Sequence, residues 1–354
     1  MSYFKSITFD TADGVKQAKF YDTNLSVVAQ DYLLALAEGD ITGHQSFKLI
    51  GYTPTMTTSE SDIWSAAGVY TFPTAAQQME FLSSDNTADI GTSIFSGTST
   101  GGSTTSLIDT TKDFTGGTAV AIGDCVILDK SGTTPEFGYV TAVAVTTLTI
   151  GGGFSSGGTG DTRAYTVIDA SAYAGAQAMM IGYLTSAFVP KREIVILNGT
   201  TVTTTVNTDI YRINGMDIIA AGANKKPTGA LSLRNLANTP VYAHITAGYT
   251  ATRKLIFTVP ATKTLYVTSI NFSYGYSTNQ THYARLYLKA TYEENLGFST
   301  KDIFLPQAEI VCANTSHYID LKSPMKFPAG IDIRASGIAT YAGVADCAIR
   351  GWIE

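Results

Sequence analysis

The fold class is decided by the stretch Ile194-Val195-Ile196-Leu197-Asn198-Gly199, followed by the threonine-rich residues 200–206. Four residues that favour β-structure run into Asn-Gly, the pair that most readily adopts the positive φ angles of a type I′ turn. The stretch therefore predicts a β-hairpin. The same pair recurs at Asn214-Gly215, so we expect a second turn there and a chain that is mainly β.

Alternating or short apolar runs bounded by turn residues continue on both sides of this stretch and predict further strands. A short strand is expected at residues 68–73, where Pro73 places it at a sheet edge. The strands expected in the C-terminal third are residues 253–259, 264–272, 282–290, 308–312, 317–321, 331–335 and 347–353. Such closely spaced short strands are typical of a β-sandwich or jelly roll.

The middle of the chain has a different composition. Residues 90–108 contain no charged side chain and are rich in Gly, Ser and Thr, which is typical of a flexible connection. The following segment has its own strand-length runs, at residues 120–128, 138–145, 147–150 and 163–167. We interpret residues 97–172 as a small β-barrel; the alternative is one continuous sandwich carrying a long loop.

These patterns predict four parts. Residues 1–50 form an N-terminal arm, and residues 51–95 with 175–235 form a first β domain that carries the inserted barrel. Residues 236–354 form a C-terminal β-sandwich or jelly roll. The expected fold class is therefore mainly β, with β-sandwich or jelly-roll domains, an inserted small β-barrel and a short N-terminal helix.

The short helix is expected at residues 24–38. Asn24 can cap its start, and Gly39 can supply the left-handed residue after its end. Its apolar residues recur at helical spacing and form one stripe. The stripe either packs on its own domain or docks on a partner subunit; the candidate docking residues are Leu25, Val28, Tyr32, Leu33 and Leu36.

Composition excludes several classes of protein. Lys and Arg number 23 against 29 Asp and Glu, for a net charge of −6, so we expect no nucleic-acid partner. No apolar run approaches the roughly 20 residues of a membrane-spanning helix, and residues 1–6 do not resemble a secretion signal. We therefore expect no membrane partner and synthesis in a cytoplasm. Cys125, Cys312 and Cys347 are expected to be buried thiols rather than disulfides or zinc ligands.

No motif for catalysis emerges. The four histidines, His44, His244, His282 and His317, lack metal-binding spacing, and no Gly-x-Ser-x-Gly sequence lies between a predicted strand and a predicted helix, the context of a nucleophile elbow. Glu293 and Glu294 are adjacent, so a strand would point them to opposite faces. Four aspartates in or beside predicted strands are expected in turns or in solvent: Asp217, Asp302, Asp320 and Asp332. We expect no enzyme, no catalytic residue, no metal and no cofactor.

Binding is a stronger alternative to catalysis. Residues 273–282 join two predicted strands and combine aromatic rings with amides and hydroxyls, a combination that suits contact with a sugar. The candidate glycan-contact residues are Tyr274, Tyr276, Asn279 and Gln280. The alternative interpretation is an ordinary polar loop whose tyrosines cover one end of a sandwich.

Several short sequence segments, called here phrases, resemble segments of virion structural proteins of tailed bacteriophages. They are Asp62-Ile63-Trp64 with residues 70–80, Ile196-Leu197-Asn198-Gly199-Thr200, residues 259–268, residues 326–333 and the end Gly351-Trp352-Ile353-Glu354. The insert, with Ile122-Gly123-Asp124 and Tyr165-Thr166-Val167 among its phrases, is similar to a small barrel found inside many phage particle proteins. The resemblance covers most of the chain from about residue 60 onward.

The resemblance implies a component of a phage particle. We expect a non-enzymatic capsid decoration, or cement, protein that stabilises the shell and acts as a homotrimer. Its partners would be copies of itself and the major capsid protein or another virion protein, and its location would be the capsid surface rather than the tail. The alternative is a tail fibre or receptor-binding protein that recognises a glycan on the host surface. A glycan-cleaving enzyme is a third, less favoured alternative.

Overall fold

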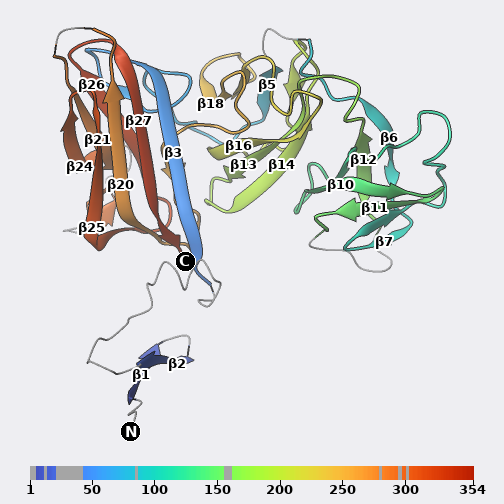
Figure 1. The fold of residues 1–354 in the computed structure, drawn as a ribbon, viewed down its shortest axis with the longest axis horizontal. Helices are drawn as coiled ribbons and strands as arrows, with labels where there is room; N and C mark the ends of the chain where they lie inside the picture. Colours follow the sequence, from blue (N-terminus) through green and yellow to red (C-terminus); the bar gives the residue numbers. More distant parts are fainter. Residues whose placement is uncertain are drawn as a thin grey trace.

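The computed structural model describes residues 5–11, 14–20, 43–83, 87–154, 162–278, 281–293, 297–299 and 303–354. Every helix or strand element in these ranges is a β-strand, so the expectation of a mainly β chain is confirmed. Three β units lie side by side (Figure 1) and are called here the sandwich, the middle unit and the insert. Two short hairpins complete the described strands: β1 (Lys5–Thr11) with β2 (Gly14–Phe20), and β22 (Tyr292–Glu293) with β23 (Phe298–Ser299).

The sandwich contains two antiparallel sheets. The first has the order β25 (Thr315–Phe327), β20 (Leu265–Gly275), β27 (Gly343–Ile353) and β3 (Gln45–Met56). The second has the order β19 (Ile256–Thr258), β26 (Asp332–Ala339), β21 (Ala284–Ala290) and β24 (Leu305–Cys312), and β4 (Ser61–Asp62) also pairs with β26. The sheets pack face to face because alternate residues along their strands are apolar, as in Phe272 and Leu286 of one shared core.

The middle unit also packs two sheets around its own core. One sheet has the order β14 (Pro190–Ile196), β13 (Ala176–Leu184) and β16 (Arg212–Ala221). The other has the order β15 (Thr203–Thr204), β5 (Met79–Ser83), β17 (Leu231–Asn235) and β18 (Val241–Ile245). Phe81, Ile181 and Leu233 are fully buried between the two sheets.

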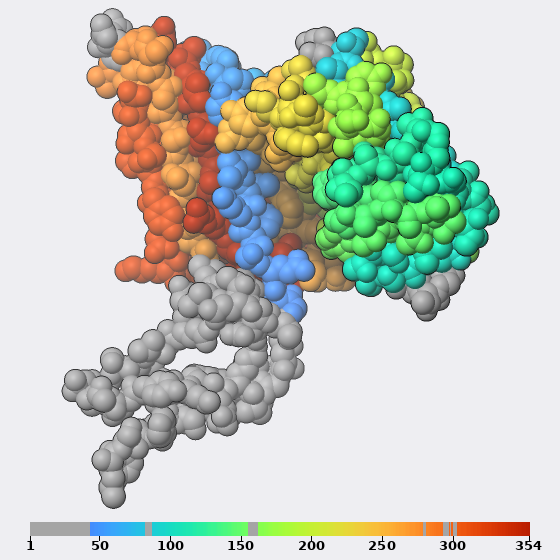
Figure 2. Space-filling view, turned by 45° about the vertical axis from the view of Figure 1, so that its right-hand side comes forward, coloured from blue at the N-terminus to red at the C-terminus, as the bar shows by residue number. Residues whose placement is uncertain are grey.

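The insert is a single curled sheet of seven strands. Their order is β6 (Ser93–Thr98), β12 (Ala164–Ile168), β9 (Cys125–Leu128), β10 (Glu136–Val143), β11 (Thr147–Gly151), β8 (Ser106–Ile108) and β7 (Gly101–Ser103). The chain passes from one edge strand, β6, to the opposite edge strand, β7, through Ser99 and Thr100 alone. The sheet must therefore curl until its edges come close, and Phe114, Val126 and Leu148 fill the inside. Figure 2 shows this unit as a lobe against the middle unit.

The observed units differ from the predicted domains at their boundaries. Strand β3, whose residues were expected partly in the N-terminal arm and partly in the first β domain, lies in the sandwich because it pairs along its length with β27. Strand β6 belongs to the insert because it pairs with β12, and β18 belongs to the middle unit through β17. The supposed flexible connection at residues 90–108 forms β6, β7 and β8, so that prediction was wrong.

Two predicted local features are also wrong. Asn198-Gly199 does turn, with φ +59° at Gly199, but β15 pairs with β5 rather than returning along β14, so no hairpin forms. Asn214-Gly215 lies inside the continuous strand β16. Residues 68–73 form no strand, because Tyr70 donates its backbone N–H to the Asp62 carboxylate at 2.7 Å instead of to a neighbouring strand. The predicted helix at residues 24–38 lies outside the described residues.

Candidate functional site

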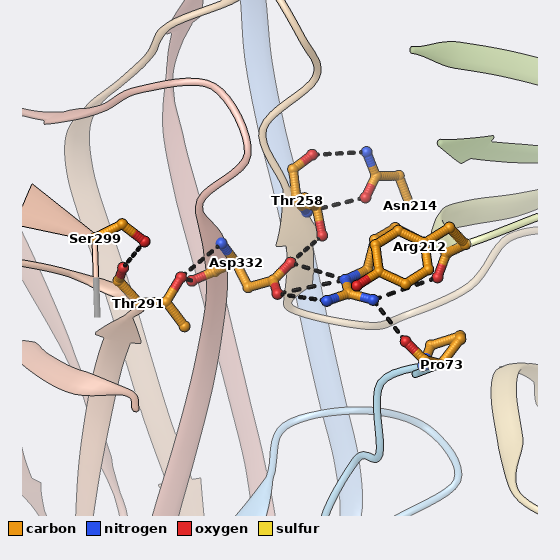
Figure 3. A network of polar contacts seen from close by, with 8 residues as sticks. Pro73, Arg212, Asn214, Thr258, Thr291, Ser299 and Asp332 are labelled. Atoms are coloured by element: carbon orange, nitrogen blue, oxygen red, sulfur yellow. Dashed lines mark hydrogen bonds and ion pairs between the residues drawn. The ribbon is translucent and has the colours of Figure 1, made fainter. Parts of the chain in front are cut away.

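An ion pair joins the middle unit to the sandwich. Arg212 begins β16, Asp332 begins β26, and both are buried, with Nη2 of Arg212 lying 3.1 Å from Oδ2 of Asp332. The Arg212 Nη1 also donates to the carbonyl oxygen of Pro73 at 2.7 Å. Figure 3 shows the carboxylate and the guanidinium facing each other between the two units. Because buried charges are costly unless paired and hydrogen-bonded, this ion pair fixes one relative position of the units.

An amide continues the same contact. The Asn214 side chain donates to the Thr258 carbonyl at 2.9 Å and accepts from the Thr258 N–H at 3.0 Å, so it pairs with β19 as a neighbouring strand would. The Thr258 hydroxyl donates to the Asp332 carboxylate, and the Asp332 N–H donates to the Thr291 hydroxyl at 3.1 Å. Figure 3 shows this chain of contacts from β16 into the sandwich. Asp332 is thus a central structural residue, which corrects its predicted role in a turn or in solvent.

A buried lysine lies beside this network. Lys254 is 2% exposed, and its Nζ donates to the carbonyls of Ile213 at 2.5 Å and Tyr242 at 3.3 Å. The ammonium also lies 4.7 Å from the ring centroid of Tyr70. The lysine therefore binds backbone of the middle unit from a position next to β19 of the sandwich.

Burial lowers the pKa of Lys254 to about 7; the Asp332 carboxylate opposes this shift and the Arg212 guanidinium adds to it. Between pH 7 and the ordinary pKa of 10.5, the unfolded chain binds a proton at this lysine that the folded chain does not. Stability should therefore rise with pH in this window, by at most about 1.4 kcal/mol per pH unit. The test is urea unfolding of wild type and Lys254→Met at pH 7, 8 and 9. We expect the advantage of the wild type to grow with pH; parallel pH profiles would contradict the assignment.

A second buried carboxylate reinforces the sandwich where it meets the middle unit. Burial raises the pKa of Asp62 to about 6, against the opposing effect of the Arg334 guanidinium, whose Nη1 lies 3.3 Å from Oδ2 of Asp62. Trp64, two residues later, packs edge-on against Tyr70 and belongs to a small core shared with Ile256. The buried charges near this boundary are thus engaged in structural contacts.

The insert is attached to the middle unit by a mixed apolar and polar contact. Cys125 and Ile168 of the insert share a buried cluster with Ile194 and Ile219 of the middle unit. The hydroxyl of Tyr139 in β10 donates to the carbonyl of Ile219 at 2.5 Å. These contacts, made on both sides of the boundary, hold the insert against the middle unit.

A carboxylate sits where the chain leaves the middle unit for the insert. Asp89 is fully buried and accepts from the N–H groups of Ala176 and Thr228, both at 2.8 Å, and of Gly229 at 2.6 Å. A Cβ added to Gly175 would lie 2.1 Å from Oδ1 of Asp89, so only glycine fits beside the carboxylate. Asp89 therefore ties the outgoing and returning connections of the insert to the loop before β17.

A cleft of about 590 Å³ lies where residues 133–137 of the insert face β13 and β14. Of its charged lining residues, Glu136 pairs with Arg163 of the insert. Lys191 pairs with Asp209 at 2.7 Å. These two charges therefore have structural partners.

Aromatic residues gather at one end of the sandwich. Tyr276 packs edge-on against His282 with ring centroids 5.2 Å apart, and His282 stacks on Tyr341 at 4.5 Å. Tyr283 follows His282 and is 50% exposed, whereas Tyr341 is 42% exposed. These four residues, Tyr276, His282, Tyr283 and Tyr341, are called here the aromatic end.

The four candidate glycan-contact residues are not all found at the aromatic end. Tyr276 belongs to the aromatic end, but Tyr274 lies in β20, is 1% exposed and donates its hydroxyl to the Tyr341 carbonyl at 2.5 Å. It therefore supports the end from beneath and cannot contact a ligand, which corrects that part of the prediction. Asn279 and Gln280 lie outside the described residues. So do all five candidate docking residues: Leu25, Val28, Tyr32, Leu33 and Leu36.

The three cysteines are free and buried, as predicted. Burial raises the pKa of the Cys125 thiol to about 12, which leaves it protonated and unreactive at neutral pH. Within the described ranges, no group of three or more His, Cys, Asp or Glu side chains is placed to hold a metal. The same residues include no helix of the length and apolarity needed to cross a bilayer.

No protein-family model, no curated protein and no solved structure matches the chain. Its role must therefore be argued from its own geometry.

Sequence reasoning missed the junction residues, although a signal was present. Lys254 directly precedes Leu255-Ile256-Phe257, and Asp332 interrupts Ile331-Asp332-Ile333. A charged residue within such apolar runs is either on an exposed strand face or buried with a partner. Local sequence could not name the partners, because Arg212 and Asp332 are separated by 120 positions.

Proposed function

We propose that the chain is a non-enzymatic structural component of a bacteriophage particle, of the capsid decoration type, and that it stabilises the shell as a homotrimer. The observation that carries this proposal is the use of the buried charges at the boundary of the middle unit and the sandwich. Lys254, Arg212 and Asp332 are each buried and each hydrogen-bonded across or along that boundary. Charged groups used in this way stiffen a molecule and leave little for chemistry.

The phage-like phrases support the proposal by their positions. Asp62-Ile63-Trp64 contributes the ion pair with Arg334 and the shared aromatic cluster. The phrase at residues 70–80 includes Pro73, the carbonyl partner of Arg212. The phrase at residues 326–333 includes Asp332 itself. Three of these phrases therefore contribute residues at or beside the boundary of the sandwich and the middle unit, as expected of a protein whose work is mechanical.

A rigid chain of units suits the mechanism of a cement protein. Association free energy at a shell comes from many weak contacts repeated by symmetry. Each contact adds its full association free energy only if the protein that makes it loses little conformational freedom on binding. The junctions at Asp332 and at Asp89 restrict that freedom in advance.

A tail fibre or receptor-binding protein is the second candidate. The exposed rings of the aromatic end favour it, because such rings suit a surface that meets another molecule. They lie at the opposite end of β20 from the chain terminus, since Leu265 pairs with Ile353 whereas Gly275 pairs with Val344 (Figure 1).

Copy number separates the two candidates. We expect quantitative mass spectrometry of purified phage particles to find this chain at a stoichiometry comparable with the major shell protein, because a decoration protein repeats with the shell lattice. The tail tape-measure protein and the shell protein of the same particles serve as internal standards for low and high copy number. A ratio as low as that of a tail component would favour the second candidate, and absence from the particles would reject both.

A further inference from the structure

We propose that the aromatic end of the sandwich is a binding site for a neutral polysaccharide. The inference concerns the isolated chain and does not depend on where the protein sits on a particle. It is carried by three features of the described residues: a row of contacting rings beside two exposed tyrosines, loop segments without formal charge, and a rigid support beneath the rings.

The rings form a connected row. Tyr276, His282 and Tyr341 follow one another at centroid distances of 5.2 Å and 4.5 Å. Tyr341 and Tyr283 are 42% and 50% exposed, so large parts of these two side chains face solvent, whereas Tyr276 is partly buried against the sandwich core. An aromatic face with an apolar body and a polar hydroxyl suits the alternating C–H and O–H surface of a sugar ring.

Arg285, two positions after Tyr283, borders the aromatic end and is paired with Glu309 at 3.1 Å. The segments that meet at this end, residues 275–278, 281–283, 313–316 and 339–345, contain no Asp, Glu, Lys or Arg. Their polar groups are hydroxyls and amides, which hydrogen-bond neutral polyols. A phosphate or sulfate polymer would require a cluster of basic side chains, and these segments contain none. The local chemistry therefore selects a neutral glycan over an anionic one.

The rings are held in place before any ligand arrives. Tyr274 donates its hydroxyl to the Tyr341 carbonyl at 2.5 Å, and its ring leaves no room for a Cβ at Gly343. Thr340 and Tyr283 exchange two hydrogen bonds, Thr340 N–H to the Tyr283 carbonyl at 2.9 Å and Tyr283 N–H to the Thr340 hydroxyl at 3.0 Å. A fixed platform loses little entropy on binding a flexible chain.

The site is also presented outward. β20 spans about 33 Å at 3.3 Å per residue, and its two ends separate the aromatic end from the point where the chain enters β3 and terminates after β27. Figure 1 shows the β20 arrow pointing away from the C-terminus. Contacts made at the terminal end would therefore leave the aromatic end accessible.

The experiment is affinity electrophoresis of the full chain in gels that contain dextran, mannan or mixed-linkage β-glucan, with heparin and alginate as anionic counterparts. We expect retardation by at least one neutral polymer and none by the anionic ones. Tyr276→Ala and Tyr341→Ala should each weaken that binding about two- to tenfold, because each removes one stacking surface. Tyr341→Phe should retain binding, because it keeps the ring.

Tyr249→Ala is the matched control, because Tyr249 is 40% exposed but lies in the middle unit. Its binding should equal that of the wild type. Thermal unfolding of each variant verifies that the sandwich is intact. Three outcomes would overturn the proposal: no retardation by any neutral polymer, retardation by the anionic polymers alone, or unchanged affinity in the folded double variant Tyr276→Ala/Tyr341→Ala. None of these outcomes bears on the copy number of the chain in particles.

Discussion

Replacing Asp332 with alanine is expected to lower the free energy of unfolding by about 3–5 kcal/mol, because it leaves the Arg212 guanidinium buried without its counter-charge. Arg212 is 6% exposed and Asp332 is 8% exposed, so little solvent screens the pair. The substitution also removes the acceptor of the Thr258 hydroxyl. Urea unfolding followed by far-ultraviolet circular dichroism measures the change, and hydrogen exchange should show the largest loss of protection at β16 and β19.

The double variant Arg212→Met/Asp332→Leu distinguishes destabilisation by an unpaired buried charge from destabilisation by lost packing. Apolar residues of similar volume often replace a buried ion pair at little cost. We therefore expect the double variant to recover most of the stability that Asp332→Ala loses. Asp320→Ala, at an exposed position of β25, should change stability by less than about 0.5 kcal/mol. A double variant as unstable as Asp332→Ala would contradict the assignment of the ion pair as the source of the effect.

Asp89→Ala is expected to destabilise the attachment of the insert by about 3 kcal/mol. The substitution removes the acceptor of three backbone N–H groups, of which those of Ala176 and Gly229 are buried. A buried N–H group that is left without a hydrogen-bond partner costs about 1–3 kcal/mol. The measurement is limited proteolysis with hydrogen exchange, which should report faster opening around residues 87–93 and 169–176 than in the wild type.

Asp113→Ala provides the control for Asp89→Ala. Asp113 also accepts a backbone N–H and a hydroxyl, both from Thr115, but it is exposed. Solvent can replace those bonds, so we expect little change in stability or exchange. Equal effects of the two substitutions would show that the burial of Asp89 is not what makes it important.

The alternation of apolar and polar residues was a reliable guide wherever a strand has one buried face. It placed β20 and β21 within about three residues of their observed bounds and predicted β26 and β27 about four residues too short at one end, because a sandwich strand must show one face to the core. It could not identify partners. β3 pairs with β27 nearly 300 residues later, and β15 pairs with β5 rather than with the adjacent β14. Such pairings depend on packing of whole sheets, which no local pattern encodes.

Composition misled where strands are poor in apolar residues. Residues 90–108 resemble a linker, but β6 obtains its stability from pairing with β12 and from the curled core behind it. For the candidate site, sequence indicated the loop that carries Tyr276 and His282 but not the stacking of His282 on Tyr341, because Tyr341 comes from a different hairpin. It also missed the burial of Tyr274 at the end of β20, where the alternation of that strand continues beyond the predicted boundary.

The most direct test of the proposed role is electron cryomicroscopy of intact purified particles, with the three-unit structure fitted into the reconstruction. The account predicts density for this chain repeated over the capsid surface, as trimers in contact with the major shell protein, and with the sandwich and middle unit in the relative position fixed by Arg212 and Asp332. Density confined to the tail, or a capsid surface without this shape, would contradict it.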